Sequence, residues 1–503
     1  MKKSIRLVSI SFPGRDLNLA PVSLKCFALK DERIAKEYTI HISQFEIPTS
    51  NDEIYNDLVG RGEELYGFTT YVWNIKKILE IAKRLKKGNS NTIIVLGGPE
   101  ASGMATKLLL QYDFIDFIFV GEGEVAFRAF LTSTNLRKVP GLVYRANGTI
   151  IFNPETVLKD LDALALPYES EDYRNFLDTS SSPVRAAIET SRGCPFSCRY
   201  CTWGTRTMRY FSLEKLKPAF KYLLKHPNVA TVYITDSNPF LRKKRARKLL
   251  NFLIEHNFDK KPITFELNPE YMTDEKLMGL ITQLKNEEFA FGVQSTAPQV
   301  LQKIGRRFDA ELYRKNINLI KKNNPKVRLW FSLIIGLPGD NYEQFLESMD
   351  FVLNLKPEGI YFHELLCLPG SEFYKNPEKY GIEYMEEAPH KVLWNDTFPH
   401  EEYNRAKSLG YHVYLIHRVA HLREDISALS HTQSGLKLVD FYSRFVEFID
   451  GKLDTLLGKT IQDISSWFFE QLANDFLKDP RNIIRLESLY KTFKRRYNHG
   501  REL

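Results

Sequence analysis

Apolar runs alternate with amphipathic segments over the first 135 residues. The clearest amphipathic segment is 74–87, where apolar residues recur every three or four positions and lysines lie between them. Such alternation predicts buried strands separated by helices, which is typical of a parallel sheet with helices on both faces. We therefore expect residues 1–140 to form a doubly wound, Rossmann-like α/β domain. The predicted strands cover 5–12, 38–45, 65–72, 92–98 and 114–121.

A hairpin and a linker are predicted after this domain. Residues 141–154 contain two β-rich runs around Ala-Asn-Gly, a typical hairpin signal. The residues after it are rich in Ser, Asp and Pro and have the character of a loop. We therefore assign 141–183 to a hairpin and linker between two domains.

Strand and helix patterns alternate again from 184 to 369. Six strand–helix units predict an open, partial parallel barrel, (β/α)6, over 184–400. Polar residues that typically cap helices precede several of the helical segments. The predicted strands cover 184–190, 230–236, 263–269, 288–295, 327–338 and 359–369. The predicted cap residues are Ser212, Thr273 or Asp274, Asp309, and Asp340 with Glu343 in a capping box.

The last part of the chain has a helical pattern. Apolar residues recur at a spacing of three to four, for example in 461–478. We expect a helical C-terminal domain over 401–503, with Trp467, Phe468 and Phe469 in its core. A substrate lid or a docking bundle is an alternative role for these helices.

Glycine and hydroxyl residues gather where the first predicted strands end. Ligands of open parallel sheets bind beyond the carboxyl ends of the strands, and glycine allows close approach of the backbone. No G-x-G-x-x-G pattern is present, so a dinucleotide is not favoured, and ordinary turn glycines remain an alternative. The candidate ligand-binding residues are Thr69, Thr70, Tyr71, Gly97, Gly98, Pro99, Gly121, Glu122 and Gly123.

Three of the five cysteines form a C-x3-C-x2-C pattern at Cys194, Cys198 and Cys201. Three thiolates suit a cubane iron–sulfur cluster in which the fourth iron stays open. A structural zinc site normally has four ligands, so zinc fits this loop poorly. Gly193 and Pro195 would shape the turn around the first cysteine. The pattern therefore predicts a [4Fe-4S] site at these three cysteines.

Polar residues also follow the predicted barrel strands, where barrel chemistry gathers. His363 and Glu364 could handle protons near the substrate, and Cys367 could be a radical or redox partner. Simpler explanations are that Asp236 is a helix cap, His363 a hydrogen-bonded structural residue and Cys367 a buried structural thiol. Cys26 is expected in the core. The candidates at this mouth are Asp236, Gln294, Ser295, Ile335, Gly336, His363, Glu364 and Cys367.

The cysteine loop, C-x3-C-x-aromatic-C after a first barrel strand, resembles the radical SAM superfamily. The resemblance implies that S-adenosylmethionine binds the open iron and is cleaved to a 5′-deoxyadenosyl radical, with Tyr200 near the adenine. It also implies roles at other strand ends, although the usual G-G-E is absent after the second strand. The implied contacts are Gln294 and Ser295 with the ribose or methionine part, Arg306 or Arg307 with the carboxylate, Ile335 and Gly336 with the adenine, and Asp236 with the amino-acid part or the substrate.

The earlier motifs GFTTYVWN, LGGPEAS and GEGE resemble the cobalamin-binding-type domain that precedes many radical SAM barrels. The resemblance implies a corrinoid on these loops. The D-x-H-x-x-G motif is absent, so no histidine from that motif would ligate the cobalt, and loss of the corrinoid is an alternative.

Composition and charge limit the cellular setting and the partners. The 70 basic and 62 acidic residues give a net charge of +8, and the basic clusters at 243–248 and 491–496 are better explained as solvated helix faces than as a nucleic-acid site. No apolar stretch is long enough to span a membrane, and the N-terminal run is predicted to be a strand rather than a signal peptide. The low cysteine content favours a reducing compartment, so a cytoplasmic location is expected.

Together the two resemblances imply a cobalamin-dependent radical SAM methyltransferase that acts on an unactivated carbon. Radical rearrangement, cyclisation or dehydrogenation without methyl transfer is one alternative, and a sensor without turnover is another. Methylthiolation of transfer RNA is less favoured because a second cysteine triad is absent. The expected partners are a small-molecule or peptide substrate and an electron donor such as flavodoxin or ferredoxin.

Overall fold

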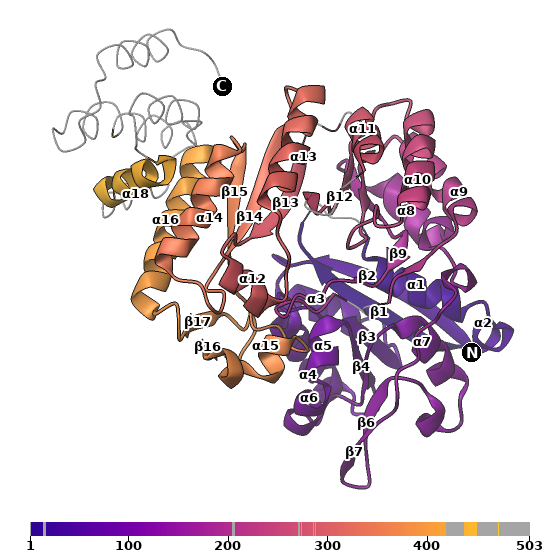
Figure 1. Ribbon diagram of the computed structural model, residues 1–503. Helices are drawn as coiled ribbons and strands as arrows, with labels where there is room; N and C mark the ends of the chain where they lie inside the picture. Colours follow the sequence, from indigo (N-terminus) through magenta and orange to yellow (C-terminus); the bar gives the residue numbers. More distant parts are fainter. Residues whose placement is uncertain are drawn as a thin grey trace.

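The computed structural model describes residues 2–13, 17–203, 207–269, 272, 274–284, 286, 288–418, 437–449 and 471. Figure 1 shows an N-terminal α/β domain below a curved barrel domain, with two further helices on the outer side of the barrel. The predicted core residues Trp467, Phe468 and Phe469 and the basic cluster at 491–496 lie outside the described residues.

The N-terminal domain is a seven-stranded sheet in the order β2-β1-β3-β4-β5-β6-β7, and its first five strands are parallel. Neighbouring residues of β1 point to opposite cores: Leu7 packs in one apolar cluster and Val8 in the other. A strand buried on both faces is continuously apolar, as the sequence pattern predicted. The strands are β1 Lys3–Ser11, β2 Tyr38–Glu46, β3 Leu65–Thr69, β4 Ile93–Gly97, β5 Phe117–Phe119, β6 Leu142–Ala146 and β7 Thr149–Phe152.

Helices cover both faces of this sheet. The helix α4 is strongly amphipathic, and its buried residues include Ile78, Ile81 and Leu85 on one side. The helices are α1 Leu19–Ala28, α2 Glu32–Glu37, α3 Asn51–Val59, α4 Ile75–Gly88, α5 Pro99–Gly103, α6 Ala105–Gln111 and α7 Gly123–Thr132.

The predicted hairpin extends the N-terminal sheet. β6 pairs antiparallel with β5, with Tyr144 opposite Phe117, and β7 pairs with β6. Asn147 and Gly148 at the turn both have positive φ, as a two-residue hairpin requires. We assigned the hairpin to the segment between the two domains. Its strands instead belong to the sheet of the N-terminal domain. The connection that follows contains η2 Leu161–Ala163, η3 Pro167–Glu169 and α8 Glu171–Thr179, whereas η1 Leu136–Lys138 precedes the hairpin.

The second domain contains the six predicted barrel strands in two parallel sheets, β12-β11-β8 and β13-β14-β15. One isolated parallel bridge, Leu267 to Phe291, connects the sheets, so the barrel is partial and open. The strands are β8 Val184–Ile188, β11 Val229–Ile234, β12 Ile263–Phe265, β13 Glu288–Gln294, β14 Arg328–Ile335 and β15 Gly359–Glu364. The helices are α9 Leu213–Lys225, α10 Lys243–His256, α11 Glu275–Gln283, α12 Pro298–Ile304, α13 Ala310–Asn323 and α14 Tyr342–Asn354.

Three predicted helix caps are confirmed. Side chains of Ser212, Asp274 and Asp309 accept hydrogen bonds from backbone N–H groups in the first turns of α9, α11 and α13. The capping box at Asp340 is wrong, because Asn341 caps α14 and accepts from the backbone N–H of Gln344. Thr273 lies outside the described residues.

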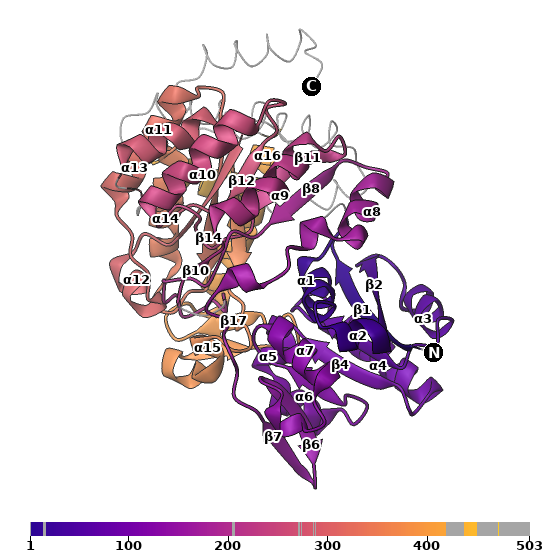
Figure 2. The same ribbon diagram turned by 90° about the vertical axis from the view of Figure 1, so that its right-hand side faces the viewer.

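The chain continues around the outer side of the barrel. α16 packs against β15 and α18, and α18 packs against α14. Figures 1 and 2 both show α5 of the N-terminal domain beside the segment after β15, and a β-carbon at Gly103 would collide with the backbone of Pro369. Among the described residues, none of the helices combines the length and apolarity needed to cross a membrane. The elements here are α15 Glu372–Lys375, η5 Pro377–Tyr380, β16 Ile382–Tyr384, β17 Val392–Asn395, α16 His400–Arg418 and α18 Leu438–Ile449.

Candidate functional site

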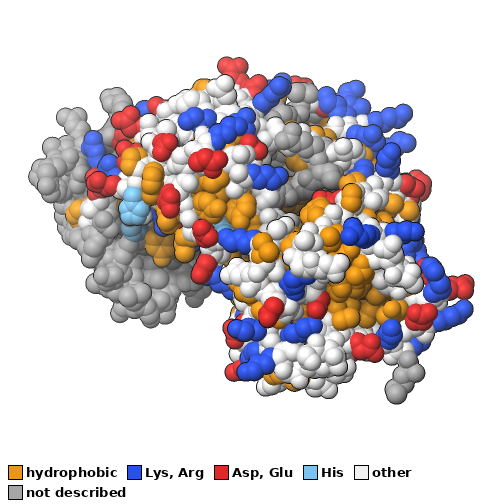
Figure 3. Space-filling model, turned by 90° about the horizontal axis from the view of Figure 1, so that it is seen from below, with side chains coloured by type: hydrophobic (Ala, Val, Ile, Leu, Met, Phe, Trp, Pro, Cys, Tyr) orange, Lys and Arg blue, Asp and Glu red, His pale blue; other side chains and the backbone are white. Residues whose placement is uncertain are grey.

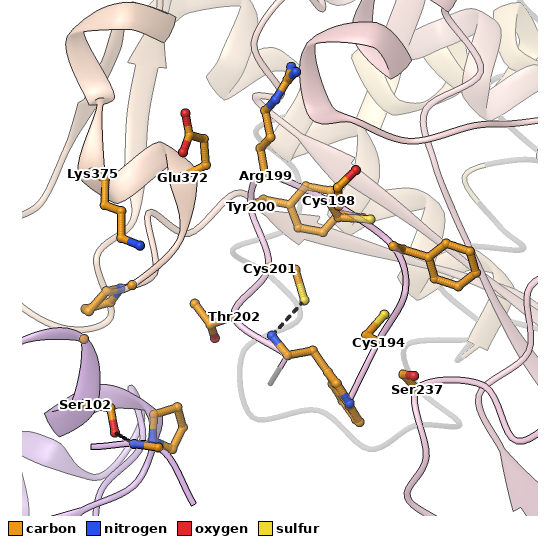
Figure 4. Close-up of a pocket in the computed structure, with 18 of the residues that line it drawn as sticks. Ser102, Cys194, Cys198, Arg199, Tyr200, Cys201, Thr202, Ser237, Glu372 and Lys375 are labelled. Atoms are coloured by element: carbon orange, nitrogen blue, oxygen red, sulfur yellow. Dashed lines mark hydrogen bonds between the residues drawn. The ribbon is translucent and has the colours of Figure 1, made fainter. Parts of the chain in front are cut away.

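A cavity of about 1300 Å³ lies between the N-terminal strand ends and the mouth of the barrel. Both domains contribute to its wall, which includes the cysteine loop, three barrel strand ends and the segment after β15 (Figure 4). The N-terminal side supplies Gly98, Pro99, Ser102, Gly121 and Glu122, and the barrel side supplies Cys194, Cys198, Tyr200, Cys201, Ser237, Glu266, Asn268, Gln294, Arg306 and Lys375, among others. The two regions that the sequence predicted to bind ligands, the N-terminal strand ends and the mouth of the barrel, therefore border the same cavity.

The cysteine loop extends from a short antiparallel ladder. Strands β9 Ser191–Arg192 and β10 Arg209–Tyr210 pair with each other, and the loop between them enters the cavity. Figure 4 shows Cys194, Cys198 and Cys201 around the same open region, and the backbone N–H of Trp203 donates to Sγ of Cys201 over 3.4 Å. Burial and the nearby thiols of Cys198 and Cys194 raise the pKa of Cys201.

Three thiols on one loop fit a cubane cluster better than a single ion. Among the residues that the structure describes, no three His, Cys, Asp or Glu side chains converge on a single-ion site. A cubane does not require such convergence, because each cysteine binds a different iron atom. The three thiols are free and line a cavity large enough for a cluster and a further ligand.

Asp236 holds the base of this loop. Its buried carboxylate accepts hydrogen bonds from the backbone N–H and the hydroxyl of both Thr190 and Ser191, at 2.6 to 3.0 Å. Burial raises the pKa of Asp236, and these four hydrogen bonds oppose that rise. Asp236, predicted at the ligand, does not line the cavity and instead positions the strand that leads into the cysteine loop.

Gln294 and Arg306 lie where the sequence predicted contacts with a ligand. Both line the cavity, and Oε1 of Gln294 is buried without a hydrogen-bond partner in the described structure. Gln294 has a φ of 69°, a strained conformation for a residue other than glycine, which is common at binding sites. Arg306 donates to the backbone oxygen of Gly292 over 2.6 Å, whereas Arg307 is exposed and does not line the cavity. Arg306, rather than Arg307, is therefore positioned toward a ligand.

Tyr200 lies beside Cys198 in Figure 4 and lines the cavity. Burial raises its pKa, although the nearby Arg306 guanidinium opposes the rise. A neutral phenol next to the cysteines can pack against a flat ligand and still donate a hydrogen bond.

The remaining barrel candidates lie away from this cavity. Ser295 is fully buried and accepts from the backbone N–H of Ala297 at the start of α12. The backbone oxygen of Gly336 accepts from Nδ2 of Asn395 over 2.9 Å, and Gly336 packs against Tyr403. Neither residue lines the large cavity. Each instead makes contacts that support a neighbouring turn.

Ile335, His363 and Glu364 line a different cavity of about 590 Å³ between β15 and α16. Burial lowers the pKa of His363. Burial disfavours ionisation of Glu364, but Lys407 and Lys391 outweigh it and hold its pKa below the usual range. Cys367 is in an apolar core, where burial raises its pKa to about 12. The predicted acid–base role at the cysteine loop therefore lacks support from the positions of His363 and Glu364.

A narrow slot of about 230 Å³ opens at the carboxyl ends of the N-terminal strands. Its walls are mostly apolar and include Leu7, Leu24, Phe119 and Phe127. A β-carbon at Gly97 would meet no atom within 4 Å, so the glycine leaves this space open. Of the predicted residues, Thr69, Tyr71, Gly97, Gly98, Pro99, Gly121 and Gly123 line the slot, and Gly98, Pro99, Gly121 and Glu122 line the large cavity.

Thr70 supports this slot rather than lining it. Its buried hydroxyl donates to the backbone oxygen of Gly97 over 2.8 Å and accepts from the backbone N–H of Ala101 over 2.9 Å. A β-carbon at Gly98 would collide with the backbone of Thr70, so only glycine allows this packing.

Ion pairs connect the N-terminal domain to the cysteine loop. Arg192, two residues before Cys194, pairs with Glu124 at 2.6 Å, with Glu189 at 3.0 Å and with Glu122 at 3.3 Å, and Arg209 also pairs with Glu122. All five side chains are mostly buried, which strengthens the interactions and makes loss of one partner costly. The GEGE motif thus fixes the position of the cysteine loop as well as bordering the cavity.

Several cavity residues were not predicted from the sequence. Phe196 lies in the cysteine loop, and the others lie on the hairpin and linker or in the segment after β15. Of these, Pro369-Gly370 carried a turn signal that could have been used. The residues are Phe152, Glu155, Val157, Phe196, Pro369, Gly370, Glu372, Lys375 and Lys379.

Asp340 provides a pH-dependent test of the barrel structure. Burial raises its pKa to about 7, and only the backbone N–H of Asn341 opposes this. Because the folded-state pKa exceeds the unfolded value near 4, stability from this group is complete below about pH 4 and is lost as pH rises to about 7. At 1.4 kcal/mol per pKa unit, the loss is about 4 kcal/mol.

We expect Asp340→Asn to remove this part of the pH dependence. Thermal unfolding midpoints measured from pH 4 to pH 8 should fall less steeply in the variant than in the unsubstituted protein. Parallel plots of midpoint against pH for the two proteins would contradict the inference that Asp340 is uncharged in the folded state at low pH.

Comparison with known families identifies the two domains. A family model described as the radical SAM superfamily matches residues 188–352, which include the cysteine loop and the four barrel strands β11, β12, β13 and β14. The chain therefore contains a radical SAM domain. A B12-binding domain model matches residues 32–131. The predicted family is therefore confirmed, with both a radical SAM domain and a B12-binding domain, and the predicted classes of cofactor agree with both.

Curated relatives are distant but extend over most of the chain. "Cobalamin-dependent radical SAM methyltransferase TokK" of Streptomyces tokunonensis is 25% identical over 475 residues, covering 86% of this chain and 68% of that protein. "2-(S-pantetheinyl)-carbapenam-3-carboxylate methyltransferase" of Streptantibioticus cattleyicolor is 25% identical over 488 residues, with the same coverage. The relatives support an enzyme, as predicted.

Solved structures confirm the predicted fold class. The cobalamin-dependent S-adenosylmethionine radical enzyme OxsB, with aqua-cobalamin and S-adenosylmethionine bound, has a TM-score of 0.68 at 14% identity, covering 99% of this chain and 84% of that chain. The methyltransferase TsrM from Kitasatospora setae, with cobalamin and a [4Fe-4S] cluster bound, has a TM-score of 0.60 at 16% identity, covering 77% and 80%. At these identities the likeness concerns the fold.

Proposed function

We propose that this enzyme transfers a methyl group from S-adenosylmethionine to an unactivated carbon of its substrate by way of a corrinoid. The observation that carries the proposal is the shared cavity of about 1300 Å³, which three cysteines border from the barrel and the glycine loops border from the B12-binding domain. A methyl group can pass from a corrinoid to a substrate radical only if both cofactor sites open onto one space.

Cys194, Cys198 and Cys201 would hold a [4Fe-4S] cluster, and the slot at Gly97 would hold the flat, apolar base of cobalamin. When bound, the cluster supplies the electron that divides S-adenosylmethionine into methionine and a 5′-deoxyadenosyl radical, and the corrinoid supplies the methyl group. Tyr200, Gln294 and Arg306 would bind S-adenosylmethionine, because a phenol, an unpaired amide oxygen and a guanidinium face the same region.

The residues of the chain orient these groups and keep the two domains aligned. Asp236 holds the strand before the cysteine loop, and Arg192 ties this loop to Glu122 and Glu124 of the B12-binding domain. The substrate, a small molecule or a peptide, would enter the remaining cavity. A low-potential carrier such as flavodoxin or ferredoxin would supply the electron.

Methyl-labelled S-adenosylmethionine tests this proposal without knowledge of the substrate. The protein is reconstituted anaerobically with iron, sulfide and hydroxocobalamin, reduced and incubated with the labelled compound. We expect formation of 5′-deoxyadenosine and recovery of the label on the extracted corrinoid. The deoxyadenosine without labelled corrinoid would instead favour rearrangement, cyclisation or dehydrogenation, and cofactor binding without either product would favour a sensor.

A further inference from the structure

Basic side chains stand around the cysteine loop, and three of them, Arg199, Lys375 and Lys379, also line the large cavity. Lys303 lies in the last turn of α12, Arg307 follows this helix, and Lys375 and Lys379 belong to α15 and η5. Each of these four residues is exposed, and Arg199 of the cysteine loop lies between them. We call Arg199, Lys303, Arg307, Lys375 and Lys379 the basic rim.

Backbone hydrogen bonds join this rim directly to the cysteine loop. The N–H of Arg199 donates to the oxygen of Ile304 over 2.9 Å, and the oxygen of Arg199 accepts from the N–H of Phe373 over 3.2 Å. A β-carbon at Gly305 would lie 2.6 Å from the oxygen of Ser197, so this contact is as close as packing allows. Arg199 is the neighbour of Cys198, and Figure 4 shows Arg199, Glu372 and Lys375 around the same loop. The rim is therefore the protein surface next to Cys198.

The rim has more basic than acidic side chains, although Arg199 donates to the backbone oxygens of Gln302 and Lys303. Lys303, Arg307 and Lys375 form no ion pair within the described structure, whereas Lys379 lies 3.6 Å from Glu372. Glu378 and the cap residue Asp309 are the other acidic residues on these segments. Because exposed unpaired cations raise the local potential, this surface favours an anionic partner.

Figure 3 shows Lys and Arg side chains mixed with Asp and Glu across most of the face that it presents. The basic residues 243–248 on α10 are numerous, but Arg245 donates to the backbone of Thr190 and Phe211, and Arg247 pairs with Asp274. This helix contacts the ladder at the base of the cysteine loop and not the cysteines themselves. Lys244 and Lys248 of α10 are exposed and supply a matched control.

We propose that the basic rim docks an acidic one-electron carrier protein of the flavodoxin class. This inference rests on the proposed function, because such a carrier is required only if the cysteine loop holds a redox cluster. The carrier gives up one electron and the cluster accepts it, and no bond forms or breaks at the interface. Electron transfer slows steeply with distance, so the surface next to Cys198 suits this role better than α10.

Binding measurements test the docking surface independently of catalysis. The probe is an oxidised bacterial flavodoxin, titrated into the reconstituted holoenzyme by calorimetry at low and at high salt. We expect Lys303→Glu/Arg307→Glu to weaken binding by about tenfold or more and to reduce its salt dependence. Lys244→Glu/Lys248→Glu changes the net charge equally and should alter binding by less than about threefold. An equal or larger loss in the α10 variant, no loss in either, or no binding to the unsubstituted holoenzyme would overturn the proposal.

A second readout separates docking from the proposed function. Formation of 5′-deoxyadenosine is measured with flavodoxin and its NADPH-dependent reductase, and again with dithionite, a small reductant that needs no docking surface. We expect the ratio of the two rates to fall about tenfold in the rim variant and to remain unchanged in the α10 variant. Absence of cleavage with dithionite in the unsubstituted enzyme would refute the proposed function, whereas an unchanged ratio in the rim variant would refute the docking surface. Matching thermal midpoints would show that both variants are folded.

Discussion

Replacing Cys194, Cys198 and Cys201 together with alanine is expected to eliminate iron binding and to lower cleavage of S-adenosylmethionine by at least about 1000-fold. A loss of that size corresponds to about 4 kcal/mol of activation free energy. The three thiols supply every cysteine in the wall of the cavity, and the other two cysteines lie elsewhere, Cys26 on α1 and Cys367 in an apolar core. No remaining thiol could therefore replace them.

Iron analysis, absorption spectra and chromatography of 5′-deoxyadenosine provide the measurements. Cys26→Ala is the matched control, because it removes a thiol outside the cavity and should retain both cluster and activity. The triple variant should still bind hydroxocobalamin, since the slot lies in the other domain. Unchanged iron content and deoxyadenosine release in the triple variant would refute the assignment of the cluster.

Gly97→Leu is expected to weaken hydroxocobalamin binding by at least about 100-fold, or about 2.8 kcal/mol. A β-carbon at this position meets no protein atom within 4 Å, and the residue lines the slot of about 230 Å³. The side chain of a leucine there would start from this open position and extend into the slot. Overpacking of a filled site costs a few kcal/mol, which is the size of the expected loss.

The folded state should tolerate this change, because Gly97 ends a strand and does not have a positive φ. Gly279→Leu is the control, since a β-carbon at Gly279 on α11 also meets no atom within 4 Å, but the site is in the barrel domain. Equilibrium dialysis with hydroxocobalamin, together with thermal unfolding, checks both variants. Retained corrinoid binding in a folded Gly97→Leu protein would show that the slot is not the cofactor site.

The ion pairs of Arg192 connect the two sites. This residue precedes Cys194 by two positions and contacts Glu122 and Glu124 at the carboxyl edge of the N-terminal sheet. These largely buried charges join the glycine loops of one domain to the cysteine loop of the other.

Local sequence patterns were sufficient for the elements and for the cysteine loop. Strands buried on both faces are continuous apolar runs, and this property follows from the two-residue period of a strand without knowledge of its neighbours. The caps at Ser212, Asp274 and Asp309 were predicted for the same reason, since a cap bonds to a backbone group within three residues. At Asp340 the local rule failed because two adjacent residues, Asp340 and Asn341, both suit a cap and only packing decides between them.

The sequence by itself determined the order of strands and helices, the three-cysteine loop and the glycine-rich strand ends, because each of these depends on contacts within a few residues. Only the tertiary structure decided which side chains face the large cavity. It turned Arg306 inward and Arg307 outward, used Asp236 to hold the loop, and placed His363 and Glu364 in another cavity. The direction of a side chain at a strand end depends on how distant segments pack around it, and no local pattern records that packing.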